Sequence, residues 1–448
     1  MNNAATRGQP RALAEIDSMI LGRAPHAVLL VGPGSVGKTT LALDLAAGLL
    51  CNDPDPRARP CRACRGCRQV ASGNHPDLHR LAPEGAGSQI RIGKASDPEP
   101  GTVRNLIGEL ALLPVEGGAR VVIVEQADRL NDDAQNAFLK MLEEPPAGVT
   151  IVLCADEEEC LLPTVRSRCV RVRLGAVGGR EIERWLGELG VADAPRAARL
   201  ARLAEGRPGL ALAYARSADA ERLRGEIARG VLDMLASGRQ ARLAAVRELM
   251  KSAGALDAAL DEWRRDVAAV TAADDGAATG AGFATTGAGR GRKGRGAKAA
   301  AAAAAETDEA AAPTDEAPAG EAPAGEAPAG EATPRLAASD RRAAAATLVS
   351  IWASVARDLA VAGAGGAARI REMELIDELP AIAPKVSAGS LHAFLTQLGE
   401  IDRQLDENVT PELALDVLAL SWPHVESGAV AGPGSAGKVG SVATPARR

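Results

Sequence analysis

The sequence predicts an α/β fold built on a parallel sheet, followed by regions that are only helical. Two observations lead to this expectation. Short apolar runs alternate with helix-type patterns over the first 175 residues, and no further strand-type run follows from about residue 176. Apolar runs bounded by turns are typical of strands that are buried on both faces, as in a parallel sheet. Their alternation with helices favours a layered α/β arrangement.

The individual elements follow from hydrophobic spacing. Residues 11–24 carry apolar side chains at helical intervals, and residues 26–31 form the first short apolar run. A strong helix is expected from Lys38 to about Leu50. Further buried strands are expected at 121–124 and 150–154, since both are wholly or almost wholly apolar.

A helix start signal stands between the last two strands. Asn131 can accept hydrogen bonds from free amides at a helix N-terminus, and Asp132 and Asp133 suit its positive end. The pattern continues to Glu144, where Pro145 and the proline after it end the helix.

The second half of the chain alternates between helical and low-complexity composition. Helical patterns fill 176–272 and return from residue 343 to about 425. Between them, residues 273–340 contain a Gly/Arg cluster, an alanine run and tandem EAPAG units. This composition has little apolar surface to bury and is typical of a disordered insert. The last residues, 426–448, are again rich in Gly, Ala, Ser and Pro and predict a disordered tail.

Composition excludes several classes of protein. The net charge of −6 argues against a freestanding nucleic-acid coat protein, because phosphate binding relies on Lys and Arg. Uninterrupted apolar runs of about 18 residues are absent from the sequence, so no membrane span is expected. Charges occupy the N-terminal positions where a signal peptide needs its apolar core. The chain is therefore expected in the cytoplasm, with reduced cysteines.

A phosphate-binding loop is predicted at Gly32–Thr39, which reads GPGSVGKT. It follows a predicted strand and opens a predicted helix, as this motif requires. Lys38 would reach the β- and γ-phosphates, and the Thr39 hydroxyl would hold Mg²⁺. A similar run at 432–438 lacks the final hydroxyl residue and any clear strand before it, so tail composition explains it. The predicted nucleotide-binding residues are Gly32, Pro33, Gly34, Ser35, Val36, Gly37, Lys38, Thr39, Thr40 and Glu125.

The catalytic half of an ATPase site is incomplete in this sequence. Hydrolysis needs an acid that holds the Mg²⁺ shell and a neighbouring carboxylate that polarises water. After the strand at 121–124 the chain reads Glu125-Gln126-Ala127-Asp128. Glu125 could serve the metal shell, but the Gln126 amide cannot act as a general base. The simpler interpretation of these four residues is a strand edge with polar capping residues. The chain is then expected to bind nucleotide and to hydrolyse it weakly or not at all.

Four cysteines predict a structural zinc site. Cys51, Cys61, Cys64 and Cys67 supply enough thiolates to close a tetrahedral centre, with no open position for catalysis. Redox switching and unligated core cysteines are the alternatives. Several arginines between the cysteines would offset the charge of a zinc tetrathiolate.

Taken together, these motifs resemble the bacterial DNA polymerase III clamp-loader subunits, which are AAA+ proteins. The resemblance covers roughly residues 10–265 and 340–425. The four-cysteine insertion carries part of this resemblance. The rest is carried by four segments, which are HAVLLVGPGSVGKTTLA at 26–42, AQNAFLKMLEEPP at 134–146, LLPTVRSRC at 161–169 and NVTPELALDVL at 408–418.

The resemblance implies a division of the chain into an AAA+ P-loop domain, a small helical lid and an all-α collar that mediates oligomerisation. The implied boundaries are 1–175 for the P-loop domain with a zinc module at about 51–75, 176–214 for the lid, and 215–272 with 341–425 for the collar.

Within the family, the resemblance favours the delta-prime kind of subunit, a stator, over the gamma/tau motor. Gln126 replaces the catalytic acid, and residues 153–156 offer no Thr or Asn for the first sensor. A glycine in 206–210 takes the place of the second-sensor arginine. The segment 73–77, GNHPD, is also similar to delta-prime. The intact P-loop keeps the motor ATPase as the alternative.

In this family the arginine of the Ser167-Arg168-Cys169 motif reaches the ATP site of the adjacent subunit. The resemblance therefore implies that Arg168 acts in trans as an arginine finger. From the residues alone, Arg168 is one of four arginines between 166 and 173, and a solvated strand edge is the simpler interpretation.

The implied partners are gamma/tau and delta subunits in a hetero-oligomer, with the sliding clamp and primer–template DNA engaged through the complex. The implied cofactors are structural Zn²⁺ and ATP with Mg²⁺. A different AAA+ remodeller acting on DNA is a further alternative, which the cysteine insertion disfavours. Basic residues from Arg290 to Lys298 could bind DNA, although a plain linker is the simpler interpretation.

Overall fold

The computed structural model describes residues 3–83, 89–94, 99–110, 114–115, 118–277, 338–406 and 409–425. The predicted tail at 426–448, with its GPGSAGK run, lies outside the described residues. So does most of the predicted insert at 273–340. Helix α11 continues to Ala277 and helix α12 begins at Ala338, so the two ends of that segment are helical.

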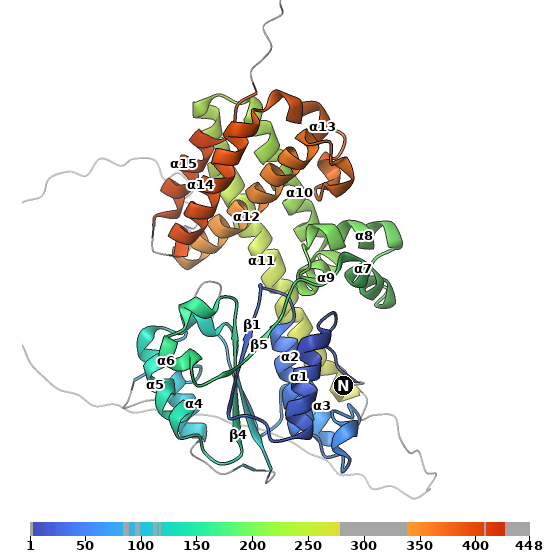
Figure 1. Ribbon diagram of the computed structural model, residues 1–448, viewed down its shortest axis with the longest axis vertical. Helices are drawn as coiled ribbons and strands as arrows, with labels where there is room; N and C mark the ends of the chain where they lie inside the picture. The colour runs from blue at the N-terminus through green and yellow to red at the C-terminus, as the bar shows by residue number, and fades with distance from the viewer. Residues whose placement is uncertain are drawn as a thin grey trace, which may run out of the picture.

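A five-stranded parallel sheet forms the centre of the N-terminal body (Figure 1). Its strand order is β2-β3-β4-β1-β5, so the first strand lies between the fourth and the fifth. The predicted apolar runs correspond to the three central strands. The five strands are β1 (Ala27–Val31), β2 (Leu78–Leu81), β3 (Arg120–Val124), β4 (Val149–Ala155) and β5 (Val170–Arg173).

Helices cover both faces of this sheet, which makes a three-layer sandwich (Figure 1). Alternate residues of β1 point to opposite faces: Val28 and Leu30 join one core, whereas Ala27 and Leu29 join the other. The first core includes α1 (Pro10–Leu21), α2 (Lys38–Leu49) and α3 (Arg65–Ala71). The second includes α4 (Val103–Leu110), α5 (Asp132–Glu143) and α6 (Pro163–Arg166).

Local signals in the sequence explain several boundaries. The Asn131 side chain accepts a hydrogen bond from the Ala134 amide at 2.9 Å, which is the predicted N-cap of α5. The edge strands β2 and β5 were not predicted. Both are short and mix apolar with polar or charged residues, such as Arg80 in β2 and Arg171 in β5, because an edge strand is less enclosed than a central one.

The remainder of the described chain is helical, as predicted. Its helices are α7 (Gly179–Glu188), α8 (Ala194–Leu203), α9 (Pro208–Arg216), α10 (Ala218–Asp233), α11 (Arg239–Ala277), α12 (Ala338–Gly363), α13 (Leu379–Ile382), α14 (Ala388–Asp406) and α15 (Pro411–Ser421). One continuous hydrophobic cluster joins α7–α9 to α10–α15. Helix α11 runs from the far helical end to α3 of the N-terminal body (Figure 1).

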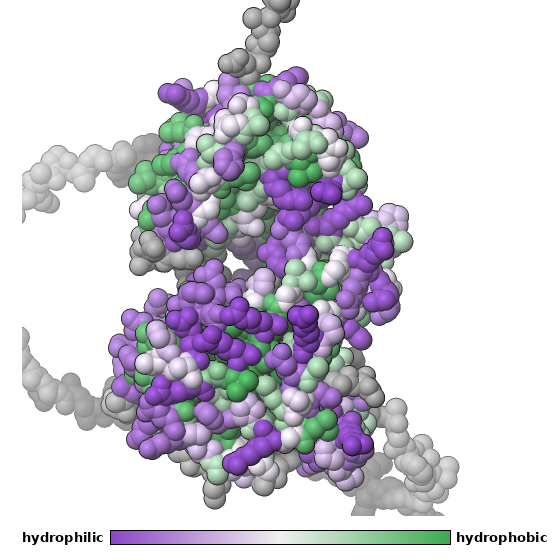
Figure 2. All heavy atoms as spheres, in the orientation of Figure 1, coloured by the Kyte–Doolittle hydropathy of each residue, from purple (hydrophilic) through white to green (hydrophobic). Residues whose placement is uncertain are grey.

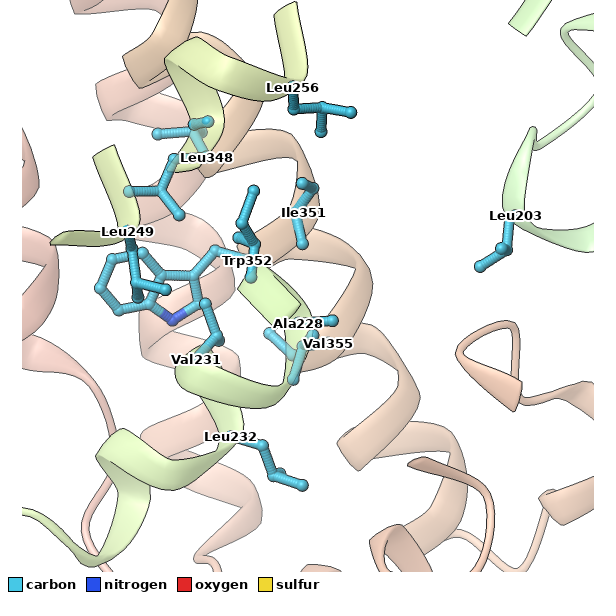
Figure 3. Packing of buried hydrophobic residues seen from close by; sticks show 14 of the residues in the cluster. Leu203, Ala228, Val231, Leu232, Leu249, Leu256, Leu348, Ile351, Trp352 and Val355 are labelled. Atoms are coloured by element: carbon cyan, nitrogen blue, oxygen red, sulfur yellow. The ribbon is translucent and has the colours of Figure 1, made fainter. Parts of the chain in front are cut away.

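The cluster is centred on α12. Trp352 is fully buried and its ring lies 5.6 Å from Trp422 and 5.7 Å from Phe394, between ring centroids. Figure 3 shows Trp352 packed among leucines and valines of neighbouring helices, including Leu249 and Val231. Among the described residues, one helical segment, Asp340–Gly363, is long and apolar enough to cross a membrane. Because 61% of the most apolar 18-residue stretch of this segment is buried inside the protein, the segment is a core helix of the helical region.

Candidate functional site

The predicted P-loop lies at the carboxyl end of β1, between β4 and β5. In open α/β sheets the crevice outside the carboxyl ends of the strands is the usual ligand position. Gly37 has a φ of +109° and Ser35 a φ of +61°, so the loop turns through left-handed conformations before α2 begins at Lys38. Successive amides in such a turn form a concave anion-binding surface.

The Lys38 ammonium is already engaged by the chain itself. It donates to the Gly32 carbonyl at 2.6 Å and the Pro33 carbonyl at 2.9 Å, and it lies 2.6 Å from Asp156 Oδ1. Only 8% of the side chain is exposed. The hydroxyl residues Thr39 and Thr40 follow in the first turn of α2 and are half-buried.

Asp156 is a site residue that the sequence motifs did not predict. It follows β4 directly, and the register pairs Ala155 with Val31, so it lies beside the start of the P-loop. The Asp156 amide donates to Asp128 Oδ1 at 3.0 Å, and burial raises the pKa of Asp128. Asp128 therefore holds in place the residue that pairs with Lys38. The sequence signal that could have identified Asp156 is its place as an acidic residue immediately after an apolar strand.

The predicted metal-shell residue is also engaged. Glu125 Oε1 accepts from Arg80 Nε at 2.9 Å and from Arg80 Nη2 at 2.6 Å. Arg80 comes from β2, which lies beside β3. Gln126 is exposed and has a φ of +52°. The chemistry expected of an ATPase acid is therefore missing at Gln126, and the neighbouring carboxylate is paired with a guanidinium.

The helical region closes over the P-loop through α9. The Gly209 amide donates to the Ser35 carbonyl at 2.9 Å. A Cβ at Gly209 would come within 3.0 Å of that carbonyl oxygen, so the contact favours a residue without a side chain. This glycine belongs to the segment where the family resemblance places the second-sensor arginine of the motor. At this contact α9 meets the P-loop through the backbone of Gly209.

Arg168 lies on the turn between α6 and β5, away from these contacts. Its Nη2 is 2.6 Å from Glu143 Oε1 at the end of α5, and its Nη1 donates to the Thr164 carbonyl at 2.8 Å. The side chains of Arg168 and Glu143 are 34% and 51% exposed. Both the predicted finger and the solvated strand edge fit this surface position.

The four predicted zinc ligands lie together after α2. Their sulfur atoms are all within 4.8 Å of one another, with 3.8 Å between Cys51 and Cys64 and 4.0 Å between Cys61 and Cys67. A zinc tetrathiolate with bonds of about 2.3 Å has sulfur–sulfur edges of about 3.8 Å, so the spacing fits the ion. Backbone amides donate to three of the sulfurs, as thiolates favour.

The cysteine module is tied to α2 by a buried charge. Asp44 is fully buried and accepts hydrogen bonds from the Ala5 amide at 3.0 Å and the Thr6 amide at 2.9 Å. Arg62, which lies between two of the cysteines, forms an ion pair with the same carboxylate. Helix α2 therefore links the P-loop at its start to the cysteine cluster beyond its end.

Comparisons with known proteins identify a related family over the N-terminal part. Residues 8–177 match the family described as DNA polymerase III, delta subunit. The delta-prime subunit of DNA polymerase III from Pseudomonas aeruginosa is 39% identical over 171 residues, which are 38% of this chain and 49% of that protein. The delta-prime subunit from Escherichia coli is 36% identical over 192 residues, which are 43% of this chain and 55% of that protein.

A tau subunit of DNA polymerase III is also similar to this chain. The tau subunit from Escherichia coli is 35% identical over 205 residues, which are 44% of this chain and 30% of that protein. The chain spans about half the length of the delta-prime relatives it matches. A solved gamma subunit-related protein from Thermotoga maritima is 23% identical and covers 56% of this chain and 77% of its own, with a TM-score of 0.31. The sequence comparisons confirm the resemblance to clamp-loader subunits that the motifs indicated.

Proposed function

We propose that this chain, whose residues 8–177 resemble the delta subunit family of DNA polymerase III, acts as a delta-prime-like stator of a bacterial clamp loader. In this role it holds the complex that loads the sliding clamp onto primed DNA, in the cytoplasm, beside gamma/tau and delta subunits. Its own P-loop binds nucleotide and hydrolyses it weakly or not at all.

One observation carries the choice of stator over motor. The two side chains that a motor would direct at ATP and Mg²⁺ are both paired within the chain, Lys38 with Asp156 and Glu125 with Arg80. Beside them, the Gln126 amide cannot take a proton from an attacking water, as a carboxylate would. A hydrolytic cycle would require both ion pairs to be broken and would still lack the base.

Arg168 supplies the chemistry that such a subunit can offer to a neighbour. It is about a third exposed, on a turn, and its ionic partner, Glu143, is about half exposed. Exposed ion pairs of this kind contribute about 0–1 kcal/mol, so a phosphate on a neighbouring subunit can replace Glu143 with little penalty. A guanidinium is always charged and binds phosphate oxygens through two donors.

The decisive experiment is the Arg168→Ala variant in a reconstituted loader. Arginine fingers raise the rate at the site they serve by about 10³-fold or more, so DNA-stimulated hydrolysis at the neighbouring site should be largely lost. Arg168→Lys keeps the charge without the planar fork and should recover only part of the rate. Arg166→Ala, which removes the arginine two residues earlier, at the end of α6, is the matched control. An unchanged rate with Arg168→Ala would remove the finger role.

The motor reading makes the opposite prediction for the isolated chain, and the similarity to tau keeps it as the second candidate. A motor would hydrolyse ATP by itself and lose that turnover with Lys38→Ala. The stator we propose shows no turnover that depends on Lys38. Steady-state hydrolysis by the purified chain, with and without primed DNA, separates the two functions.

A structural Zn²⁺ and a helical assembly surface complete the proposal. Cys51, Cys61, Cys64 and Cys67 would hold the ion and fold the module around it.

In the region proposed as the collar, α15 exposes an apolar stripe at helical spacing, formed by Leu413, Val417 and Leu420. Figure 2 shows hydrophobic residues on the upper, helical part of the molecule. This stripe is the proposed contact with the collar of an adjacent subunit.

The domain division implied by the family remains part of this proposal. We assign residues 1–175 to the P-loop domain, 176–214 to the lid, and 215–272 with 341–425 to the collar. The shared hydrophobic cluster of α7–α15 supports a lid that packs on the collar.

A further inference from the structure

The three donors of the Lys38 ammonium are matched by three acceptors of the same chain. Two are carbonyls of the P-loop itself, and the third is the carboxylate of Asp156. A lysine ammonium has three N–H donors and no acceptor, so this set is complete. In a P-loop the lysine is the residue that meets the β- and γ-phosphates. Asp156 therefore supplies an anion to the group that normally receives one from a nucleotide.

The position of Asp156 is fixed by the fold. Strand β4 lies beside β1 in a parallel register, and the Gly32 amide donates to the Ala155 carbonyl at 3.3 Å. The amide of Asp156 is in turn held by the Asp128 carboxylate at 3.0 Å. A Cβ built on Gly34 would lie 2.9 Å from Asp156 Oδ2, so the carboxylate lies directly against the loop.

In the part of the chain that the structure describes, Asp156 forms an ion pair with Lys38, and the neighbouring Asp128 is paired with Arg129. Arg80, on the edge strand β2, donates through both Nε and Nη2 to Glu125. Glu125 is thereby withdrawn from the shell of the Mg²⁺ that would neutralise a terminal phosphate. A nucleoside triphosphate brings one more phosphate, and one more negative charge, toward Lys38 than a diphosphate does. Like charges at short range oppose that last phosphate group.

We propose that Asp156 occupies the position of the terminal phosphate at Lys38 and makes this P-loop select a nucleoside diphosphate over a triphosphate. This inference rests on the proposed nucleotide binding by the P-loop and is independent of Arg168. The site then holds its nucleotide as a structural ligand, and no γ-phosphate is needed for the lid contact between Gly209 and Ser35. Asp156 is the specificity-determining residue of the site.

The test is calorimetric titration of the full chain with ADP and with a non-hydrolysable ATP analogue, each with Mg²⁺. The unaltered chain should bind ADP about tenfold or more tightly than the analogue. In Asp156→Asn the analogue should gain affinity while ADP changes little, so the ratio should approach one. Glu159→Gln removes the same charge from an exposed position three residues further on and should leave the ratio unchanged. Circular dichroism checks that each variant is folded.

Three outcomes would overturn the inference. An unchanged ratio in Asp156→Asn removes the selectivity role but leaves nucleotide binding in place. A loss of affinity for the analogue would make Asp156 a metal ligand instead. Failure of both nucleotides to bind either form would refute the proposed nucleotide binding as well. In each case the Arg168 experiment in the reconstituted loader decides the stator role separately.

Discussion

Two cations of the α/β body, Lys38 and Arg168, lie in opposite surroundings. Lys38 is almost fully buried and has three acceptors within 3 Å, one of them a carboxylate. Arg168 lies on a turn, a third exposed, and pairs with a carboxylate that is half in solvent. The P-loop side of the molecule is internally neutralised, whereas the Arg168 turn is available for exchange of partners.

Under the proposed function, this difference favours Arg168 over Lys38 for chemistry between subunits. Lys38 is buried although Asp156 is 46% exposed, so losing the carboxylate would leave a buried ammonium with only two carbonyl acceptors, which makes Lys38 costly to redirect. An exposed pair exchanges one partner for another at little cost, because water compensates both groups. The proposed stator would in this way be suited to offering a cation to a neighbour and unsuited to using its own.

The largest expected effect comes from removing the metal that the cysteine cluster fits. Helix α2 joins the P-loop to this cluster, so the ion would stabilise the internally neutralised side of the molecule. Structural zinc sites contribute about 10–16 kcal/mol of apparent binding free energy in small zinc peptides. Chelation under reducing conditions should therefore lower the melting temperature more than any single substitution discussed here.

The measurement pairs metal analysis with thermal unfolding. Purified protein should contain about one equivalent of zinc, since four thiolates complete one tetrahedral shell. Cys61→Ser should lose the metal, whereas Cys160→Ser, at an exposed position outside the cluster, should keep it. Protein without metal but with an unchanged melting temperature after chelation would contradict the assignment.

A smaller but still large effect is expected at Asp44, the buried anchor of α2. Asp44→Ala would remove the acceptor of two backbone amides and of the Thr6 hydroxyl, and Arg62 would keep only its contact with the Asn3 carbonyl. Removing one partner of a buried charged network costs about 3–5 kcal/mol. Asp44→Asn keeps one acceptor oxygen and should lose clearly less. Urea unfolding measures both, and a change below about 1 kcal/mol for Asp44→Ala would show that the N-terminal segment does not depend on this carboxylate.

The parts of the fold that could be predicted from the sequence are those marked by an unbroken apolar run or by a local motif. Strands β1, β3 and β4 are wholly or nearly wholly apolar, and the α5 N-cap at Asn131 is a local motif. Strands β2 and β5 mix apolar with charged residues because they lie at the sheet edges, so periodicity could not separate them from loops. Their positions depend on pairing with distant segments.

The candidate site divides in the same way. The P-loop and the cysteine cluster are contiguous motifs, and the spacing of their residues predicts which ligand each would bind. The partners of Lys38 and Glu125 could not be predicted, because each pair depends on strand order. Asp156 reaches Lys38 only because β4 lies beside β1, and Arg80 reaches Glu125 only because β2 lies beside β3. Arg168 was found through a family motif, and its contact with Glu143 required the packing of α6 on α5.

The smallest expected effect, and the sharpest test of the contrast between the two cations, is Glu143→Gln. The variant removes the ionic partner of Arg168 and leaves its hydrogen bond to Thr164. Because the pair is exposed, the free energy of unfolding should change by less than about 1 kcal/mol, and less still at high salt. Glu144→Gln, at the next exposed position, is the matched control. In a reconstituted loader, freeing Arg168 should leave DNA-stimulated hydrolysis unchanged or raise it, since the competing carboxylate is gone. A fall as large as that of Arg168→Ala would mean that Glu143 positions the guanidinium, and the Arg168 turn would then be as firmly held as the P-loop.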